Sequence, residues 1–244
     1  PARCAAHDPG DRDRGHGDPR LQQGQQVGGQ FEHVGDRIRA VFRARYAVVT
    51  MRPEAPFDTR SGRPAGLVLA AGAGRRFGGP KALARDADGT PWVAKAVAAL
   101  RAGGCEPVIV VLGAGADEAS PLVPPGARIV RTDRWSEGVA ASLRAGLEAA
   151  ASLPAPAVVV IPVDTPELPA AAVSRLAERA APDALASADY RGEPGHPVLI
   201  GRGHWSALAA AATGDIGARP YLRAHGAEAV ECGELWSGTD RDVR

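Results

Sequence analysis

The sequence predicts an α/β domain of three layers, in which helices flank a mostly parallel sheet. Three observations support this fold class. Strand and helix patterns alternate from about residue 65 onward, the strand candidates are short apolar runs bounded by Gly or Pro, and Ala, Val and Leu dominate this part. Residues 1–64 are instead rich in Arg, Asp, Gln, Gly and Pro. We therefore expect a folded domain at 65–244 and a disordered or spurious extension at 1–64.

The first strand candidates are apolar runs at 67–71, 108–112, 127–130 and 158–162. Between the first two, a helix should begin at Thr90 and Pro91, because a hydroxyl can cap a helix and proline suits its first turn. The glycine pair at 103–104 should end this helix. A second helix is expected to open after Ser136 and run to about residue 151. A third is expected at 170–180.

Beyond residue 184 the pattern is less regular and adds substrate-facing elements to the same domain. Three further apolar runs are strand candidates, and two alanine-rich segments are helix candidates. The strand candidates lie at 185–188, 197–200 and 229–232, and the helix candidates at 204–211 and 216–224. Met51 is the only methionine in the chain. We expect it to be the natural start, with residues 1–50 an upstream read-through that native mass spectrometry would test.

Charge and cysteine content restrict the partners and the compartment. The formal net charge is +1, so no basic field favours nucleic acid or an anionic membrane, and we expect neither as a partner. The three cysteines, Cys4, Cys105 and Cys232, form no Cys-x-x-Cys pair, which argues against a disulfide framework and a zinc site. No apolar stretch approaches the roughly 20 residues of a membrane span. These features predict a cytoplasmic protein.

The most informative segment is the cation-rich loop, residues 72–81, which follows the first strand candidate. It combines four glycines with Arg75, Arg76 and Lys81, and a glycine-rich turn loaded with cations can hold a polyphosphate against backbone N–H groups. The chain has 27 arginines but only two lysines, so Lys81 suggests that a compact point charge is required there. The predicted ligand is a nucleoside triphosphate.

Two familiar phosphate-binding fingerprints fail in this loop. A dinucleotide fingerprint needs a third glycine, and Phe77 stands there. A mononucleotide loop needs Gly-Lys-Ser/Thr, but Lys81 lies between Pro80 and Ala82. An NAD-dependent oxidoreductase would also need a ribose-binding acid near the end of the second strand, and residues 112–115 offer none. A flexible turn after a strand is the remaining alternative, and it does not explain three cations.

Asp164 follows the strand candidate at 158–162, at the sheet edge where open α/β folds bind ligands. A carboxylate at this place suits Mg²⁺ shared with phosphate oxygens. The structural alternative is a helix cap made by Asp164 or Thr165. Taken alone, Asp164 favours the cap, whereas together with the cation-rich loop it favours the metal.

The loop resembles the signature of the nucleotidyltransferases that make molybdenum-cofactor dinucleotides, the MobA/MocA-like nucleotidyltransferase family. The segment 69–72, Arg76, Gly78 and Lys81 match, while Gly74 replaces a common Ser and Phe77 a common Met. Four further segments are similar to family motifs. They are Asp-x-Pro at 164–166, Trp-x-x-Gly-x-x-x-Ser-Leu at 135–143, Gly-His-Pro-Val-Leu at 195–199 and Gly-Asp-x-Gly-Ala-Arg at 214–219. A partial fifth match at 240–244 covers an acidic motif of the family.

The resemblance implies a Rossmann-like fold of the nucleotide-diphospho-sugar transferase type and a set of site residues. Arg76, Lys81 and Asp164 would be catalytic, and Asp164, Asp240 and Asp242 would hold Mg²⁺. Residues implied to bind the nucleotide are Leu69, Ala70, Ala71, Gly72, Gly74, Arg75, Gly78, Gly138 and Ser142. His196 and Arg219 would face the acceptor.

The implied reaction transfers CMP from CTP, or GMP from GTP, to a phosphorylated acceptor such as molybdopterin, with loss of pyrophosphate. Ala71 matches the form associated with cytidine, whereas glycine there goes with guanine. A molybdoenzyme or its chaperone is the implied protein partner. Two alternatives stay open: a nucleotidyltransferase acting on sugar phosphates, and a non-catalytic module that binds the nucleotide or the cofactor.

Overall fold

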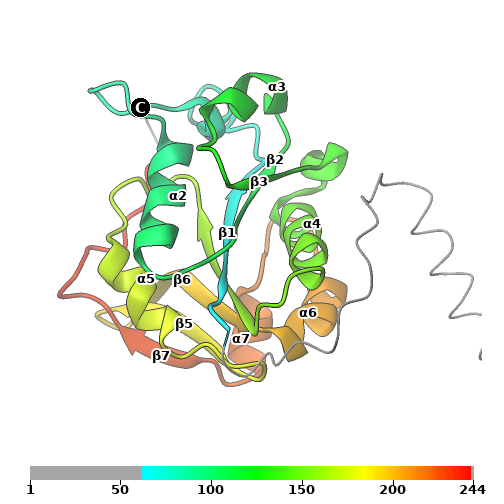
Figure 1. Cartoon of the computed structure of the whole chain (residues 1–244), viewed down its shortest axis with the longest axis vertical. Helices are drawn as coiled ribbons and strands as arrows, with labels where there is room; N and C mark the ends of the chain where they lie inside the picture. The colour runs from blue at the N-terminus through cyan, green and yellow to red at the C-terminus, as the bar shows by residue number, and fades with distance from the viewer. Residues whose placement is uncertain (1–61, 243–244) are drawn as a thin grey trace, which may run out of the picture. The chain divides into compact units, whose positions relative to one another are not determined.

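A computed structural model describes residues 62–242, in which seven strands form one sheet (Figure 1). Their spatial order is β3-β2-β1-β4-β6-β5-β7. Only β6 runs antiparallel to its neighbours β4 and β5, so the sheet is mostly parallel, as predicted. The strands are β1 (Ala65–Ala70), β2 (Val108–Leu112), β3 (Arg128–Arg131), β4 (Ala157–Pro162), β5 (Leu185–Tyr190), β6 (Glu193–Gly201) and β7 (Glu228–Glu231).

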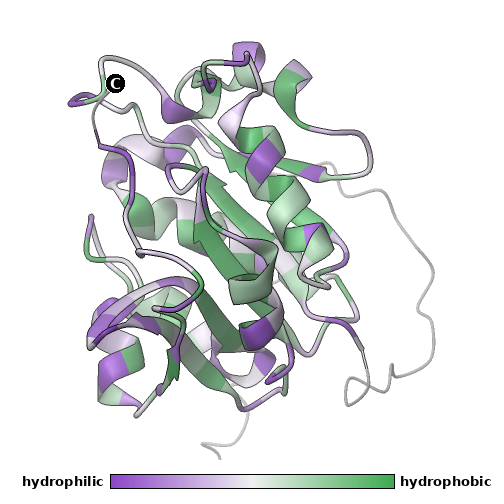
Figure 2. Ribbon diagram, turned by 90° about the vertical axis from the view of Figure 1, so that its left-hand side faces the viewer, coloured by the Kyte–Doolittle hydropathy of each residue, from purple (hydrophilic) through white to green (hydrophobic). Residues whose placement is uncertain are grey.

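The central strands are continuous apolar runs because helices cover both of their faces. All five residues of β2 are buried, as are the first five of β4. Strands buried on both sides have no solvent face that would require alternating polar residues. The edge strands β3 and β7 are mostly exposed. Figure 2 shows the same contrast, with hydrophobic strands in the middle of the fold.

Two groups of helices make the outer layers, one on each face of the sheet (Figure 1). One face is covered by α2 (Trp92–Ala102) and α5 (Ala170–Ala177), which pack residues such as Leu100 and Val173 against it. The opposite face is covered by α4 (Val139–Ala151), α6 (Trp205–Ala211) and α7 (Arg219–Ala224). The predicted three-layer α/β class is therefore confirmed.

Several boundaries differ from the predictions for local reasons. Helix α2 begins at Trp92 with Pro91 in the capping position, so the Thr90 hydroxyl does not cap it. Helix α4 begins at Val139 after Gly138, and Ser136 belongs to a short 3-10 helix, Asp133–Glu137. The predicted third helix ends at Ala177 rather than at residue 180. The segment 216–224 is helical only from Arg219, because Gly217 adopts a φ of +64°.

The pattern at 116–122 was too short to predict helix α3 (Ala116–Ala119) and the 3-10 turn after it, Ser120–Leu122. Two further 3-10 turns are Lys81–Leu83 and Arg202–His204. The expectations for residues 1–61, including Cys4 and the start at Met51, lie outside the described residues.

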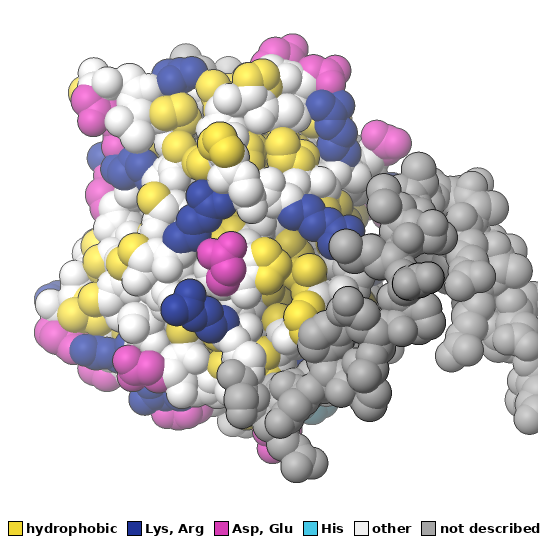
Figure 3. All heavy atoms as spheres, in the orientation of Figure 1, with side chains coloured by type: hydrophobic (Ala, Val, Ile, Leu, Met, Phe, Trp, Pro, Cys, Tyr) yellow, Lys and Arg dark blue, Asp and Glu magenta, His cyan; other side chains and the backbone are white. Residues whose placement is uncertain are grey.

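Within residues 62–242, no helix combines the length and apolar character that crossing a bilayer requires. Basic and acidic side chains are interspersed on the face that Figure 3 presents. This mixed surface agrees with the near-zero net charge of the sequence.

Candidate active site

The cation-rich loop is closed by its own backbone. Gly79 donates its N–H to the carbonyl of Gly74 at 3.1 Å, and Gly74 has a φ of +58°. A Cβ atom on Gly74 would lie 2.0 Å from the carbonyl oxygen of Gly79. Residue 74 must therefore be glycine, both for its left-handed conformation and for the close approach of the two chain segments.

The loop forms one wall of a cavity of about 820 Å³ beyond the carboxyl ends of β1 and β4. Most of the predicted site residues line this cavity although they come from distant parts of the sequence. They are Leu69, Ala70, Gly72, Gly74, Arg75, Arg76, Lys81, Gly138, Ser142, Asp164, His196, Arg219, Asp240 and Asp242. Ala71 is buried, and neither it nor the exposed Gly78 lines the cavity.

Asp164 reaches the loop because β1 and β4 are parallel neighbours. Leu69 pairs with Pro162 across the two strands, and the Val163 N–H donates to the Leu69 carbonyl at 3.1 Å. The strand pairing thus places the residue after Val163 beside the start of the loop. The carboxyl ends of parallel strands lie at one edge of the sheet, as predicted for a ligand-binding α/β fold.

Lys81 connects two carboxylates at the mouth of the loop. Its Nζ donates to Asp164 Oδ2 and to Asp242 Oδ1, each at 2.8 Å. Burial alone would lower the pKa of the Lys81 ammonium, but the hydrogen bonds and charges of the two aspartates outweigh it and raise this pKa. The hydrogen bond from Lys81 in turn lowers the pKa of Asp242. The two groups therefore form a charged pair at neutral pH.

Asp164, Asp240 and Asp242 form a carboxylate cluster in which one oxygen of each lies within 4.8 Å of the others. Asp164 Oδ1 is buried and has no hydrogen-bond partner among residues 62–242. A buried carboxylate oxygen needs a partner, and a divalent cation supplies one. Oxygen ligands of this kind suit a hard divalent metal, so the donor set fits the predicted ion.

The structural alternative for Asp164 and Thr165 is wrong. The next helix, α5, starts at Ala170 and has Pro169 in its capping position. The Thr165 hydroxyl instead donates to the Pro162 carbonyl at 3.0 Å. Neither residue caps a helix, which leaves the Asp164 carboxylate to Lys81 and to the cavity.

The amino end of α4 is tied to the segment 214–215, a contact that sequence reasoning missed. Asp215 Oδ1 accepts the Val139 N–H at 3.3 Å, and the Gly214 carbonyl accepts the Ala140 N–H at 2.9 Å. Gly138 has a φ of +100°, and a Cβ there would lie 2.4 Å from the Gly214 carbonyl carbon. The Gly-Asp-x-Gly-Ala-Arg pattern marks this segment in the sequence, but no sequence feature pairs it with residue 138.

His196 and Arg219 line the same cavity as the loop and the carboxylates. Burial lowers the pKa of His196, although the Asp164 charge opposes the shift, and its Nδ1 atom is buried without a partner in the described part of the chain. Arg219 donates from Nη2 to the Pro194 carbonyl at 3.1 Å. The cavity thus joins a cation-rich wall, a carboxylate cluster and a neutral histidine.

A cation-rich loop facing a carboxylate cluster at the carboxyl edge of a mostly parallel sheet defines a nucleotidyltransferase. Comparison with known proteins identifies the family. The chain belongs to the family of the MobA-like NTP transferase domain, whose model matches residues 66–230.

Named relatives and a solved structure support this membership. The chain is 37% identical over 190 residues to the nicotine blue oxidoreductase of Paenarthrobacter nicotinovorans, covering 73% of this chain and 91% of the relative. It is 33% identical over 150 residues to the molybdenum cofactor guanylyltransferase of Rhodobacter capsulatus, covering 59% and 67% of the two chains. The crystal structure of a Mycobacterium tuberculosis Rv0371c homologue, from Mycobacterium sp. strain JC1, has a TM-score of 0.64. It is 30% identical, and the match covers 75% of this chain and 92% of that one.

Proposed function

We propose that this nucleotidyltransferase moves CMP from CTP to a phosphate group of a small-molecule acceptor, molybdopterin, and releases pyrophosphate. The observation that carries the proposal is the bridge from Lys81 to Asp164 and Asp242 at the end of the cation-rich loop. It brings one ammonium group and two carboxylates together in one cavity, which supports a site for phosphates and a metal. The relative named as a guanylyltransferase supports the class of reaction and the acceptor.

The reaction needs no nucleophile from the protein, because a phosphate oxygen of the acceptor attacks the α-phosphorus of the nucleotide. The bond from the α-phosphorus to the oxygen bridging to the β-phosphate breaks, and pyrophosphate leaves with that oxygen. The protein contributes alignment of the two substrates and stabilisation of the charge on the leaving group. Both tasks need cations at fixed positions around the phosphates.

Lys81, Arg75 and Arg76 are the side chains proposed to contact the triphosphate. Lys81 is mostly buried and fixed by two aspartates, whereas Arg75 and Arg76 are exposed at the rim of the cavity. Arg76 lies 3.8 Å from Asp242. We assign Lys81 to the transition-state charge and the two arginines to capture of the incoming nucleotide.

We propose Mg²⁺ as the ion held by Asp164, Asp240 and Asp242. When bound, it would neutralise phosphate charge and fix the phosphate oxygens for in-line attack. The buried, unpartnered Asp164 oxygen supports this assignment. In the same cavity, we assign His196 and Arg219 to the acceptor, since Arg219 offers a cation for its phosphate and His196 a neutral ring nitrogen.

We propose that Ala71 influences the base preference through the backbone at the start of the loop. Ala71 is buried, and its carbonyl accepts the Ala114 N–H at 3.0 Å. A preference for cytosine would therefore arise from the position of the backbone at residue 71, not from contact with its methyl group. A glycine there would change the backbone freedom at the point where the loop begins.

Pyrophosphate release tests the proposed function. The purified protein is incubated with Mg²⁺ and each of CTP, GTP, ATP and UTP, in the presence of molybdopterin, of a sugar phosphate or of no acceptor. We expect release with CTP and molybdopterin together. Release with GTP alone among the nucleotides would correct the base, release with a sugar phosphate would correct the acceptor, and no release with any pair would favour a binding module.

The name of the other relative, an oxidoreductase, suggests a second candidate function, which is oxidation or reduction of a small molecule. Hydride transfer would need a bound redox cofactor, and the loop departs from the dinucleotide fingerprint at Phe77. The segment after β2, which ends at Leu112, carries Gly113, Ala114 and Gly115 and no ribose-binding acid. Oxidation of NADH or NADPH by the same preparation, without pyrophosphate release, would favour the oxidoreductase.

A further inference from the structure

Two members of the carboxylate cluster lie on a segment without regular structure. Asp240 and Asp242 belong to the C-terminal tail, residues 237–242, which contains neither helix nor strand. Both aspartates are exposed, whereas Asp164 lies two residues beyond the end of the buried strand β4. Ordering such a segment costs about 1–2 kcal/mol per residue in backbone entropy. Other contacts must therefore hold the tail where the cluster needs it.

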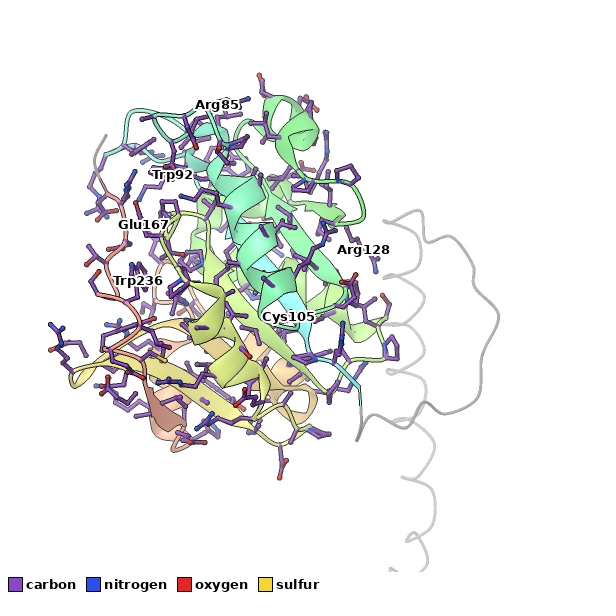
Figure 4. All side chains as sticks on the ribbon, turned by 60° about the vertical axis from the view of Figure 1, so that its left-hand side comes forward. Arg85, Trp92, Cys105, Arg128, Glu167 and Trp236 are labelled. Atoms are coloured by element: carbon purple, nitrogen blue, oxygen red, sulfur yellow. The ribbon has the colours of Figure 1, made fainter. Side chains whose placement is uncertain are left out.

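Arg241, between the two aspartates, makes those contacts. Its backbone N–H donates to the Asp164 carbonyl at 2.8 Å, which aligns the tail with the end of β4. Its guanidinium forms an ion pair with Glu167 and lies 3.4 Å from Asp86 Oδ1. The same guanidinium stacks 5.6 Å from the centre of the Trp92 ring. Figure 4 shows Trp92 and Glu167 on the side of the molecule along which the tail runs.

The partners of Arg241 are themselves fixed. Asp86 accepts the Trp92 indole N–H at 2.8 Å and forms an ion pair with Lys95, the second of the two lysines. The hydrogen bond from Lys95 lowers the pKa of Asp86. Trp92 is buried at the start of α2 and packs on Phe77 of the cation-rich loop, with ring centres 5.2 Å apart. Arg241 thus docks on side chains that are held by further contacts of their own.

The tail borders two hollows, and its consecutive side chains at 240–242 line one or the other in turn. Asp240 and Asp242 line the cavity that holds the predicted site. Arg241 lines a smaller pocket of about 410 Å³ on the other side, together with Phe77, Trp92 and Arg85. A contact made by Arg241 on one side therefore fixes the two neighbouring carboxylates on the other.

We propose that Arg241 is a positioning residue that holds Asp240 and Asp242 in place for the divalent metal. It acts through Glu167, Asp86 and Trp92 and touches neither the metal nor the substrates. The inference rests on one part of the proposed function, which is that the carboxylate cluster binds the metal required by the reaction. Supporting partners of this kind tune a metal site from outside its ligands, and their loss typically weakens binding about 10–100-fold.

The test is titration of the full chain with Mn²⁺, followed by the electron paramagnetic resonance signal of the free ion. We expect Arg241→Ala to weaken Mn²⁺ binding about tenfold or more, with an unchanged unfolding temperature. Arg241→Lys should recover part of the loss, because lysine keeps a charge for Glu167 but lacks the planar fork that also reaches Asp86. Arg223→Ala removes an exposed arginine at the end of α7 and serves as the matched control.

Glu167→Gln tests the contact from its other side if Arg241→Ala fails to fold. It should weaken Mn²⁺ binding as well, and the double variant should bind no worse than Arg241→Ala alone. Wild-type affinity in Arg241→Ala, or in Glu167→Gln where the first does not fold, would overturn the proposal. Failure of the proposed function is a different result: the wild-type chain would bind Mn²⁺ in the titration yet release no pyrophosphate with any substrate pair.

Discussion

The cation-rich loop and the C-terminal tail bring opposite charges to one cavity, and they are fixed in opposite ways. The loop is set by its own backbone, through the Gly74–Gly79 hydrogen bond and the strand before it. The tail has one backbone hydrogen bond, from Arg241 to the Asp164 carbonyl, and otherwise depends on the Arg241 side chain, whose partners lie far away in the sequence. Lys81 joins the two regions through Asp242. The comparison indicates that backbone changes should damage the loop, whereas side-chain changes should damage the tail.

The largest effect is expected where the two regions meet. Lys81→Ala removes the cation that contacts both Asp164 and Asp242. Loss of one such preorganised group typically lowers kcat about 10²–10³-fold, while the fold should persist because Lys81 lies outside the hydrophobic core. Pyrophosphate release measures the effect. Arg223→Ala, which removes an exposed cation at the end of α7 that does not line the cavity, is the control and should retain most activity.

Wild-type turnover in Lys81→Ala would show that the contact of Lys81 with Asp164 and Asp242 does not contribute to catalysis. Equal losses in Lys81→Ala and Arg223→Ala would point to a general effect of removing positive charge. Circular dichroism on both variants distinguishes these results from unfolding.

The next prediction tests whether the loop depends on its backbone. Gly74→Ala places a Cβ 2.0 Å from the Gly79 carbonyl oxygen at a φ of +58°. A non-glycine residue in this conformation costs about 1–3 kcal/mol before any steric clash is counted. We expect a lower free energy of unfolding in urea and weaker nucleotide binding. Gly72→Ala is the control for stability, since a Cβ there meets no atom within 4 Å in the described chain.

If both alanine variants unfold at the same urea concentration, the loop is not held by its backbone closure. The expectation that backbone changes damage the loop would then be wrong. A loss of nucleotide binding in Gly74→Ala without loss of stability would restrict the effect to the loop itself.

Some of this site could be predicted from sequence because its residues are contiguous. The first strand, the loop and Lys81 span residues 66–81, and Asp164 follows an apolar run directly. The strand pairing that unites them is the usual one for parallel α/β sheets. By contrast, Arg241 and Asp86 are 155 positions apart, and no local pattern pairs them.

The antiparallel direction of β6 and the docking of residues 214–215 on α4 also depend on tertiary contacts, which no local sequence pattern encodes. A short apolar run such as 197–200 indicates a strand but not its direction, because the apolar pattern is the same in both. The cap of α4 shows how tertiary contacts override local ones. Ser136 suits a cap by residue type, yet Asp215 supplies the carboxylate from 76 positions away.

A smaller effect is expected at the contact between the segment 214–215 and the amino end of α4. Asp215→Ala removes the carboxylate that accepts the Val139 N–H at 3.3 Å. Loss of a capping side chain costs about 1 kcal/mol, so we expect a modest decrease in the free energy of unfolding. Ser136→Ala is the control, because its side chain makes no capping hydrogen bond to α4. A greater loss in Ser136→Ala than in Asp215→Ala would reinstate the cap predicted from sequence.

The smallest expected effect concerns His196, whose environment differs from that of the charged loop and tail. Burial lowers its pKa below the ordinary value of 6.5. Below pH 6.5 the unfolded chain takes up a proton that folded His196 does not, so the free energy of unfolding decreases as the pH falls toward the folded pKa. In His196→Gln, the free energy of unfolding should decrease less between pH 6 and pH 5 than it does in the wild type. Above pH 7, its dependence on pH should be the same in both proteins. Urea unfolding at a series of pH values measures both slopes, and an unchanged slope at pH 5–6 in the variant would mean that His196 is protonated in the folded protein.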